Sequence, residues 1–185
     1  MMPFDEGVVR FLFGLTERNF LFRELVVFCA RLLPYFIGAG FLILLRQVAA
    51  RRRAIFIFFI ALLSIVVSRG LITEIIHYFF DHARPFVTLG LTPLVVASGP
   101  SFPSGHAAAF FALATIAFMF GKRWGIVFLS LAALNALARV AAGAHWPSDI
   151  IAGIVVGVSS GLFVRWLLRR EERALAETNS GVAVI

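Results

Sequence analysis

Long apolar runs recur along this chain at lengths that fit a bundle of membrane-spanning helices. A helix needs about 20 mainly apolar residues to cross the hydrocarbon core of a bilayer. Five stretches approach or exceed that length, at 21–46, 54–80, 104–121, 124–143 and 148–169. Hydrophobic residues make up 61% of the chain, a share typical of membrane proteins. The sequence therefore predicts an all-α fold, a polytopic membrane helical bundle with about five transmembrane helices.

The two ends of the chain differ from these runs. Residues 4–16 are apolar at helical spacing but short, so they are expected to form an N-terminal helix in the membrane interface. The opening residues lack the basic segment of a cleaved signal peptide. Residues 1–170 are expected to form a single membrane domain, and residues 171–185 a polar C-terminal tail.

The net charge of +7 is concentrated in short basic runs between the apolar segments. These runs follow the first, third and fifth predicted spans, at 46–53, 122–123 and 165–173. The loops on the other side, 81–103 and 144–147, hold Arg84 as their only lysine or arginine. Because basic loops tend to stay in the cytoplasm, the pattern predicts a cytoplasmic C-terminus. It favours membrane orientation over nucleic-acid binding, so no nucleic-acid partner is expected.

Histidine, arginine and aspartate residues gather at the predicted outer ends of spans two to five. All four histidines of the chain, His77, His82, His106 and His145, belong to this set or adjoin it. Polar and charged residues are costly in a membrane and often mark functional positions there. Arginines and a helix start can hold a phosphate, while histidines can attack it and supply a proton. The set therefore indicates a phosphate-handling site.

The segment Pro103-Ser104-Gly105-His106 opens an apolar run and predicts a helix start. Free N–H groups and the helix dipole make such a start an anion site. Gly105 lets an oxyanion approach the backbone, Ser104 adds a hydroxyl donor, and His106 can act as a general acid. The alternative is an ordinary helix start beside an unrelated histidine.

A second group, Arg139, His145 and Asp149, flanks the turn between the last two spans. His145 and Asp149 are four residues apart, which is about one helical turn. Asp149 is expected to hydrogen-bond one ring nitrogen of His145, fixing the tautomer and leaving the other nitrogen free to attack. The alternative is a helix-capping Asp149 beside an interfacial histidine.

Three further arginines and a glutamate complete the polar set. Arg84 follows the second span, where its guanidinium suits phosphate oxygens. Arg31, Arg69 and Glu74 lie within predicted spans and are expected to face the bundle interior. A structural ion pair and a direct catalytic role both remain open for these three.

Gly153, Gly157 and Gly161 recur every four residues in the fifth predicted span. Small residues at this spacing let helices approach closely. Packing inside the bundle is favoured over a dimer interface, and the oligomeric state is left open.

Together these elements resemble the type-2 phosphatidic acid phosphatase family. The family pattern is a lysine, six residues and Arg-Pro; then Pro-Ser-Gly-His; then Ser-Arg, five residues, His, three residues and Asp. This chain matches it at Arg84-Pro85, 103–106, Arg139, His145 and Asp149. The resemblance covers about residues 54–169, most of the chain. It implies a membrane phosphatase domain that acts on a lipid phosphate and needs no metal or other cofactor.

The resemblance also implies a role for each matching residue. His145 would be the nucleophile and form a phosphohistidine, and Asp149 would orient it. His106 would protonate the leaving group and later activate water. The implied phosphate ligands are Arg84, Arg139, Ser104 and the Gly105 N–H.

Two positions depart from the family pattern. His77 stands at the lysine position, and Ala138 replaces the serine before Arg139. His77 is still expected to contact the phosphate, with a charge that depends on pH. An active enzyme is expected because the nucleophile and the acid are both present.

The small size and the five-span plan resemble the bacterial undecaprenyl-diphosphate phosphatases of this family. That resemblance implies a multi-pass protein of the bacterial inner (plasma) membrane, embedded among membrane lipids, with its active site facing the periplasm or the outside. Phosphatidic acid, phosphatidylglycerol phosphate and lipid A phosphate stay open as substrates, because the matching residues recognise the phosphate and not the tail.

Other functional classes fit the sequence less well. A metal-dependent hydrolase could use the histidines and Asp149, but no carboxylate cluster accompanies them. A non-catalytic lipid-binding or scaffold protein would not need intact His106, His145 and Asp149. A vanadate-using haloperoxidase shares the family's site, but such enzymes are soluble.

Overall fold

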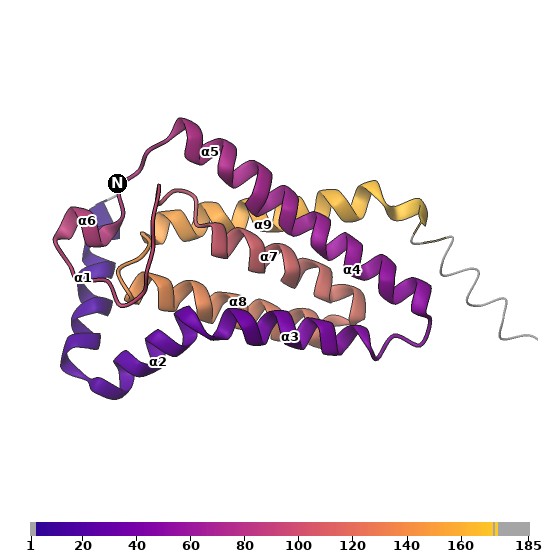
Figure 1. Cartoon of the computed structure of the whole chain (residues 1–185), viewed down its shortest axis with the longest axis horizontal. Helices are drawn as coiled ribbons and strands as arrows, with labels where there is room; N and C mark the ends of the chain where they lie inside the picture. The colour runs from indigo at the N-terminus through magenta and orange to yellow at the C-terminus, as the bar shows by residue number, and fades with distance from the viewer. Residues whose placement is uncertain (1–2, 172, 174–185) are drawn as a thin grey trace, which may run out of the picture.

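The computed structural model describes residues 3–171 and 173, and all regular secondary structure in that part of the chain is helical. The predicted all-α fold is confirmed. Most of the predicted C-terminal tail, 171–185, lies outside the described residues. The elements in chain order (Figure 1) are α1 (Pro3–Arg18), α2 (Phe20–Arg31), α3 (Leu33–Leu45), α4 (Arg51–Ile65), the π-helix η1 (Val66–Thr73), α5 (Glu74–Phe79), α6 (Pro85–Leu89), α7 (Gly105–Ala117), the 3-10 helix η2 (Phe118–Phe120), α8 (Lys122–Ala141) and α9 (Pro147–Leu167).

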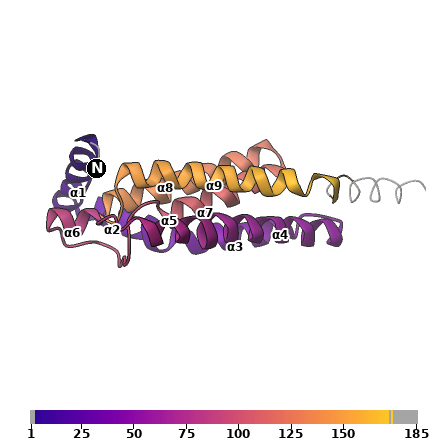
Figure 2. The ribbon, with the colours of Figure 1, turned by 90° about the horizontal axis from the view of Figure 1, so that it is seen from above.

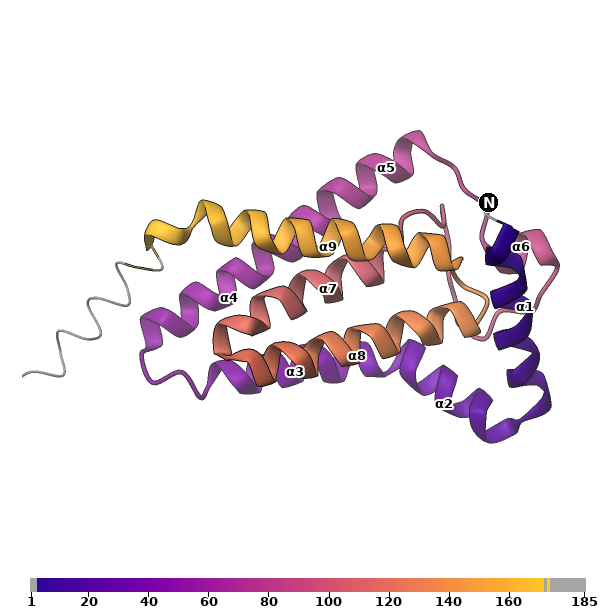
Figure 3. The ribbon, with the colours of Figure 1, turned by 180° about the vertical axis from the view of Figure 1, so that it is seen from behind.

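The helices form an elongated bundle in which α7 is central (Figure 3). It packs against α9, α8, α4 and η1. Alanines such as Ala108, Ala112 and Ala114 are fully buried along α7, and their small side chains let the surrounding helices approach closely. Large apolar side chains of the outer helices, such as Phe59 and Val155, remain exposed. An apolar exterior of this kind suits contact with lipid.

Helices occupy all five positions where spans are predicted. Three are long and apolar enough to cross a membrane: the continuous stretch Arg51–Phe79, α8 and α9. The bent pair α2 and α3 brings the number to four if it is one span. The remaining predicted span, 104–121, is the shorter apolar helix Gly105–Phe120. Because other helices surround it, its backbone is shielded from lipid despite its length.

The first predicted span is broken, since α2 and α3 meet at an angle of 49°. Pro34 lies in the first turn of α3, and it has no N–H to donate to the preceding turn. Asn135 of α8 donates to the carbonyl of Cys29 at 2.8 Å, so an acceptor near the end of α2 is satisfied from another helix. The predicted span 21–46 therefore consists of two helices that meet at a bend.

The prediction that Arg31, Arg69 and Glu74 are enclosed by the bundle is wrong, because all three residues are exposed. Arg69 nevertheless lies against the first residue of α7. Arg69 and Glu74 form an ion pair whose side chains are 44% and 54% exposed. Arg31 is exposed too, at the end of α2. A long arginine side chain can keep its charged head in a polar region while its stem lies along apolar surface.

Helix α1 lies across one end of the bundle (Figure 2). The Asp5 carboxylate accepts hydrogen bonds from the N–H of Ser148 at 3.1 Å and from its hydroxyl at 2.8 Å, which ties α1 to the first turn of α9. Phe4 and Phe11 stay exposed, as expected of an interfacial amphipathic helix. The predicted N-terminal helix is confirmed, and it covers the bundle end to which α6 and the start of α9 belong.

Packing inside the bundle is confirmed for the glycines of α9. A methyl group on Gly153 would lie 2.6 Å from the carbonyl oxygen of Ser104 and 2.8 Å from Cβ of Ala107. A methyl group on Gly161 would lie 2.9 Å from Cβ of Thr115. These separations are shorter than van der Waals contact, so α9 can approach α7 this closely only with glycine at these positions.

Gly153→Ala is expected to lower both stability and activity, because the added methyl group pushes against the backbone at the start of α7. Overpacking of this kind costs about 1–3 kcal/mol, partly offset by the better helix propensity of alanine. Gly38→Ala is the matched control, since nothing lies within 4 Å of that helical position. Thermal unfolding in detergent should show a lower midpoint for Gly153→Ala alone. Equal midpoints for the two variants would contradict the close approach.

Candidate active site

The predicted site residues meet at the bundle end that α1 covers. The site draws on the loop after α5, the start of α7, the end of α8 and the start of α9. Gly143 has a φ of 73°, a left-handed conformation that suits glycine and lets the chain turn between α8 and His145. Arg84, Ser104, Arg139, His145 and Asp149 are all buried there.

The hydrogen bonds of His145 define which ring nitrogen carries its proton. Nδ1 lies 3.1 Å from the carbonyl oxygen of Ser101, and a carbonyl can only accept, so Nδ1 carries the hydrogen. Nε2 then holds a free lone pair and lies 3.3 Å from Nη1 of Arg84. The ring therefore presents Nε2 as a nucleophile beside a guanidinium.

Asp149 organises the turn around His145 more than it contacts the ring. Its Oδ2 accepts the N–H of Trp146 at 2.8 Å and a short hydrogen bond from the hydroxyl of Ser101. The distance from Oδ2 to Nδ1 of His145 is 3.5 Å, longer than the Ser101 contact. The predicted pairing of His145 and Asp149 is thus present as a longer contact, with a backbone carbonyl as the direct acceptor.

Two residues contact Asp149 that the sequence does not identify as site residues. Ser101 bridges Asp149 and His145, and His82 places Nδ1 3.4 Å from Oδ1 of Asp149. The N–H of Ser101 also donates to the carbonyl of His82 at 2.7 Å, so these two loop segments are joined. Both residues lie in the irregular segments before and after α6, where no periodic pattern predicts which side chains turn inward.

Ser101→Ala is expected to reduce kcat about 5- to 30-fold, because Asp149 loses a hydroxyl donor worth roughly 1–2 kcal/mol while the backbone contact to His145 remains. Ser160→Ala is a matched control: its buried hydroxyl has no hydrogen-bond partner in the described part of the chain. Phosphate release under saturating substrate measures the effect. Unchanged kcat in Ser101→Ala would show that this hydroxyl does not hold Asp149 in its working position.

Arg84 uses all five of its N–H groups inside the protein. One faces Nε2 of His145, and the other four donate to backbone carbonyls at 2.9–3.0 Å, those of Ser98, Gly99, Pro100 and Ala144. Arg84 thereby fixes loop 98–100 against the turn that carries His145. A phosphate that reached Nε2 would meet Nη1 of Arg84, so phosphate binding by Arg84 stays a prediction that involves this one donor.

Ser104 caps α7 as the sequence predicts. Its hydroxyl accepts the N–H of Ala107 at 3.4 Å, and its own N–H donates to the carbonyl of Asp149 at 3.0 Å. The first N–H groups of α7, including that of Gly105, have no carbonyl partner within the helix and can receive an anion. His77 places Nε2 3.0 Å from the carbonyl oxygen of Pro103. It therefore supports the loop before α7, and its contact with phosphate stays a prediction.

A cavity of about 360 Å³ reaches His106 and Arg139. Its other walls include Arg31 and Tyr35 at the α2–α3 break and the loop 93–96. Arg139 is only 5% exposed, yet its Nε has no hydrogen-bond partner among the described residues. A buried donor without a partner is costly, which makes Arg139 a ready ligand for an anion.

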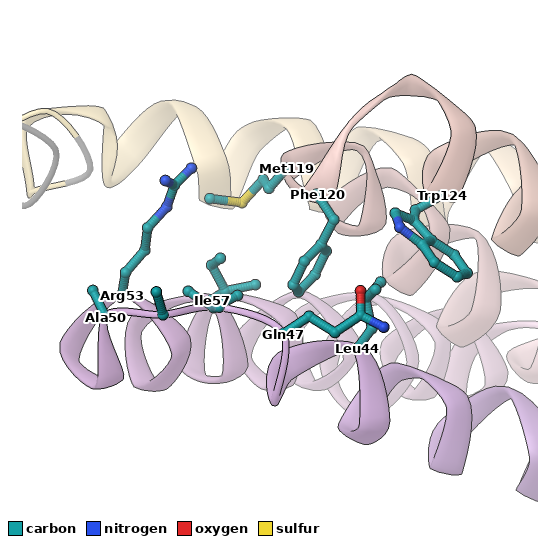
Figure 4. Close-up of a pocket in the computed structure, with 10 residues that line it drawn as sticks. Leu44, Gln47, Ala50, Arg53, Ile57, Met119, Phe120 and Trp124 are labelled. Carbon is teal, nitrogen blue, oxygen red and sulfur yellow. The ribbon is translucent and has the colours of Figure 1, made fainter.

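A second cavity, of about 410 Å³, lies at the opposite end of the bundle (Figure 4). It is lined by the turn between α3 and α4 and by residues near η2, with Arg53 as the charged residue and Phe120 and Trp124 as aromatic walls. None of the predicted site residues lines it. The cavity beside His106 and Arg139 is therefore the candidate substrate site.

Burial is the main reason that the pKa of His145 is lowered to about 4. Contact with Asp149 raises it in part, while the charges of Arg139 and Arg84 lower it further. His145 is consequently neutral well below its ordinary pKa of 6.5, and its Nε2 lone pair is available at physiological pH.

Metal-binding geometry is not found in residues 3–171 and 173, where no group of three His, Cys, Asp or Glu side chains is placed to hold an ion. The site thus consists of a neutral histidine, a buried carboxylate, a second histidine on a cavity and two arginines. Such a set can bind a phosphate and attack it.

Comparison with known proteins gives concordant matches. The PAP2 superfamily matches residues 58–173. The Bacitracin transport permease protein BcrC of Bacillus licheniformis is 30% identical, over 89% of this chain and 82% of that protein. The Undecaprenyl-diphosphatase BcrC of Bacillus subtilis is 31% identical, over 83% and 79% respectively. A Lipid A 1-phosphatase of Rhizobium etli is 32% identical, over 85% and 74%.

The fold is also found in a solved structure. Aquifex aeolicus LpxE has a TM-score of 0.71 to this chain and 23% sequence identity, covering 88% of this chain and 95% of that one. At that identity the likeness shows the fold alone. The superfamily match covers more than half of this chain and includes every predicted site residue. The chain therefore belongs to the PAP2 superfamily and is a multi-pass membrane enzyme that removes phosphate from lipids.

Proposed function

We propose that this enzyme hydrolyses the terminal phosphate of undecaprenyl diphosphate, giving undecaprenyl phosphate, through a phosphohistidine at His145. The observation that carries the proposed mechanism is the tautomer of His145. With its hydrogen on Nδ1 and bonded to the carbonyl of Ser101, the ring presents the Nε2 lone pair next to Nη1 of Arg84.

In the first step, Nε2 of His145 attacks the terminal phosphorus, and the bond from phosphorus to the bridging oxygen breaks. His106, which enters this step as its protonated imidazolium, donates a proton to that oxygen, so the lipid leaves as its monophosphate. Arg84, Arg139, Ser104 and the N–H of Gly105 hold the oxygens of the transferring phosphoryl group. Asp149, held by Trp146 and Ser101, offsets the positive charge that develops on the ring of His145.

In the second step, a water molecule attacks phosphorus and the bond between phosphorus and Nε2 breaks. His106, now without its proton, takes one from the attacking water, so the two steps restore its starting state. Inorganic phosphate leaves, and His145 is again neutral with its hydrogen on Nδ1. Protons and bonds therefore balance over the cycle without any further reactant.

The choice of substrate rests on the relatives and on the cavity. One relative is named as an undecaprenyl-diphosphatase and another as a lipid A 1-phosphatase, at nearly the same identity. Both names describe a phosphate on a large lipid, and the cavity beside His106 and Arg139 has room for a phosphate head group. Lipid A phosphate, phosphatidic acid and phosphatidylglycerol phosphate are the competing substrates.

Phosphate release by the purified protein, tested on these four lipids in matched micelles, is the deciding experiment. The proposal predicts the highest kcat/KM on undecaprenyl diphosphate, inhibition by orthovanadate and full activity in EDTA. A higher kcat/KM on lipid A phosphate would replace the proposed substrate. Loss of activity in EDTA that zinc or magnesium restores would replace the proposed mechanism.

We also propose that the site faces the periplasm or the outside of the cell. Support comes from the basic residues, which concentrate at the bundle end opposite the site, where Arg53 lies beside the second cavity (Figure 4). Lys122 and Arg123 begin α8 at that same end. Basic residues of this kind favour the cytoplasmic side.

A further inference from the structure

We propose that Arg69 is an additional phosphate-binding residue of this site, which supplies a permanent positive charge from the middle of the long α4–α5 helix. Sequence comparison with the family pattern points instead to His77, eight residues further along the chain. The inference deepens the proposed function and rests on it.

The position of Arg69 is defined by its contact with the start of α7. A methyl group on Gly105 would overlap Nε and Cδ of Arg69, and would lie 2.9 Å from Cζ. The guanidinium therefore lies directly against the first residue of α7, where the free N–H groups of the helix are expected to hold the phosphate. The long helix that carries Arg69 passes alongside α7 at this point (Figure 1).

The positive charge of Arg69 is close enough to act on Arg84. The pKa of Arg84 is lowered mainly by burial; Asp149 opposes that shift, and the charge of Arg69 adds to it. Arg69 thus acts on Arg84 through space, although no hydrogen bond joins them. Two arginines that repel each other are stabilised when a phosphate binds between them.

The other cationic residues of the site have few N–H donors left for a bound phosphate. All five N–H groups of Arg84 are used inside the protein, and Nε2 of His77 faces the carbonyl of Pro103. Arg139 has an unpaired Nε, but one guanidinium cannot neutralise a phosphate dianion. Arg69 donates only through Nη1, to Glu74, among the described residues, which leaves Nε and Nη2 available.

The competing explanation is that Arg69 only stabilises its helix through the ion pair with Glu74. The two explanations differ in what they predict for Glu74. If the pair is structural, removing either partner should have the same effect. If Arg69 binds phosphate, Glu74 competes with the substrate for the guanidinium, so its removal should leave binding unchanged or make it tighter. The π-helical segment that holds Arg69, Val66–Thr73, is of a kind often found at functional sites.

The test measures the affinity for orthovanadate through the thermal shift of the full-length protein in detergent. It compares wild type, Arg69→Ala, Arg69→Lys and Glu74→Gln. Loss of a charge-assisted contact predicts about 10- to 100-fold weaker binding in Arg69→Ala and a smaller loss in Arg69→Lys. Glu74→Gln should bind at least as tightly as wild type. Arg10→Ala, which breaks an exposed ion pair with Glu6 on α1, is the matched control and should bind like wild type.

Equal weakening in Arg69→Ala and Glu74→Gln would overturn the proposal, as would unchanged binding in Arg69→Ala. If Arg69→Ala is too unstable to purify, Arg69→Lys and Glu74→Gln still decide, because a shared loss in both supports the structural pair. Vanadate binding does not depend on which lipid is the substrate. An Arg69-dependent vanadate affinity in a protein that leaves undecaprenyl diphosphate intact would keep this proposal and reject the proposed substrate.

Discussion

His145→Ala should abolish turnover, with phosphate release falling about 10⁴-fold or more, because the substitution removes the proposed nucleophile. His145→Gln should be equally inactive, although it retains bulk and a polar tip. Both variants are to be assayed on undecaprenyl diphosphate and on a lipid monophosphate, since loss of a nucleophile affects every substrate. The ring of His145 is 2% exposed, so loss of packing must be separated from loss of chemistry.

Thermal unfolding and gel filtration in detergent provide that separation. His145→Gln is expected to remain folded and to bind orthovanadate, because the arginines and the start of α7 are intact. Appreciable phosphate release by a folded His145→Gln protein would contradict the assignment of His145 as the nucleophile.

His106→Ala is expected to lower kcat by about 100- to 10,000-fold on a lipid monophosphate and much less on a lipid diphosphate. A monophosphate must expel an alkoxide, which needs a proton, whereas a diphosphate expels a phosphate, which is a better leaving group. His106 is half-buried and lies with Arg139 on the wall of the cavity, where a bound substrate would meet it.

Comparing kcat on the two substrate classes measures this difference directly. With a diphosphate, His106→Ala should also accumulate the phosphoenzyme, since the water that hydrolyses it loses its base. The same fractional loss on both substrate classes would remove His106 from the role of general acid.

The helices of this fold are largely predictable from the sequence, because apolar runs bounded by Gly, Pro and basic residues leave few other solutions in a membrane. The break at Leu32 is the exception. Pro34 is visible in the sequence, but neighbouring groups can accommodate a proline in a membrane helix. Here Asn135 of α8 donates a hydrogen bond to the carbonyl of Cys29 near the break. Such a contact depends on tertiary packing and has no local signature.

The site is predictable to the extent that its residues lie at helix ends. His106, Arg139, His145 and Asp149 are placed by α7, α8 and α9, and those helices bring them to one end of the bundle. The paths of the irregular segments before and after α6 follow from no periodic pattern. The inward position of Ser101, the contact of His82 with Asp149 and the five donor bonds of Arg84 therefore emerge only from the structure.

The contact of Arg69 with α7 is also not predictable from the sequence. The sequence leaves a structural ion pair open for Arg69, and the structure contains one with Glu74. Its contact with Gly105 depends on how the π-helical turn directs the side chain toward α7, which no spacing rule predicts. Functional roles that arise from contacts between distant segments are thus the part of the site that sequence reasoning misses.

Identification of the phosphorylated atom decides whether His145 is the nucleophile. His106→Ala protein mixed with undecaprenyl diphosphate would be quenched in alkali, because phosphohistidine is acid-labile, and analysed by ³¹P NMR and by mass spectrometry of its peptides. We expect one phosphoryl group on Nε2 of His145, since Nδ1 carries the hydrogen that bonds to the carbonyl of Ser101. Phosphate on Nδ1, on another residue, or on no residue while phosphate is still released would contradict it.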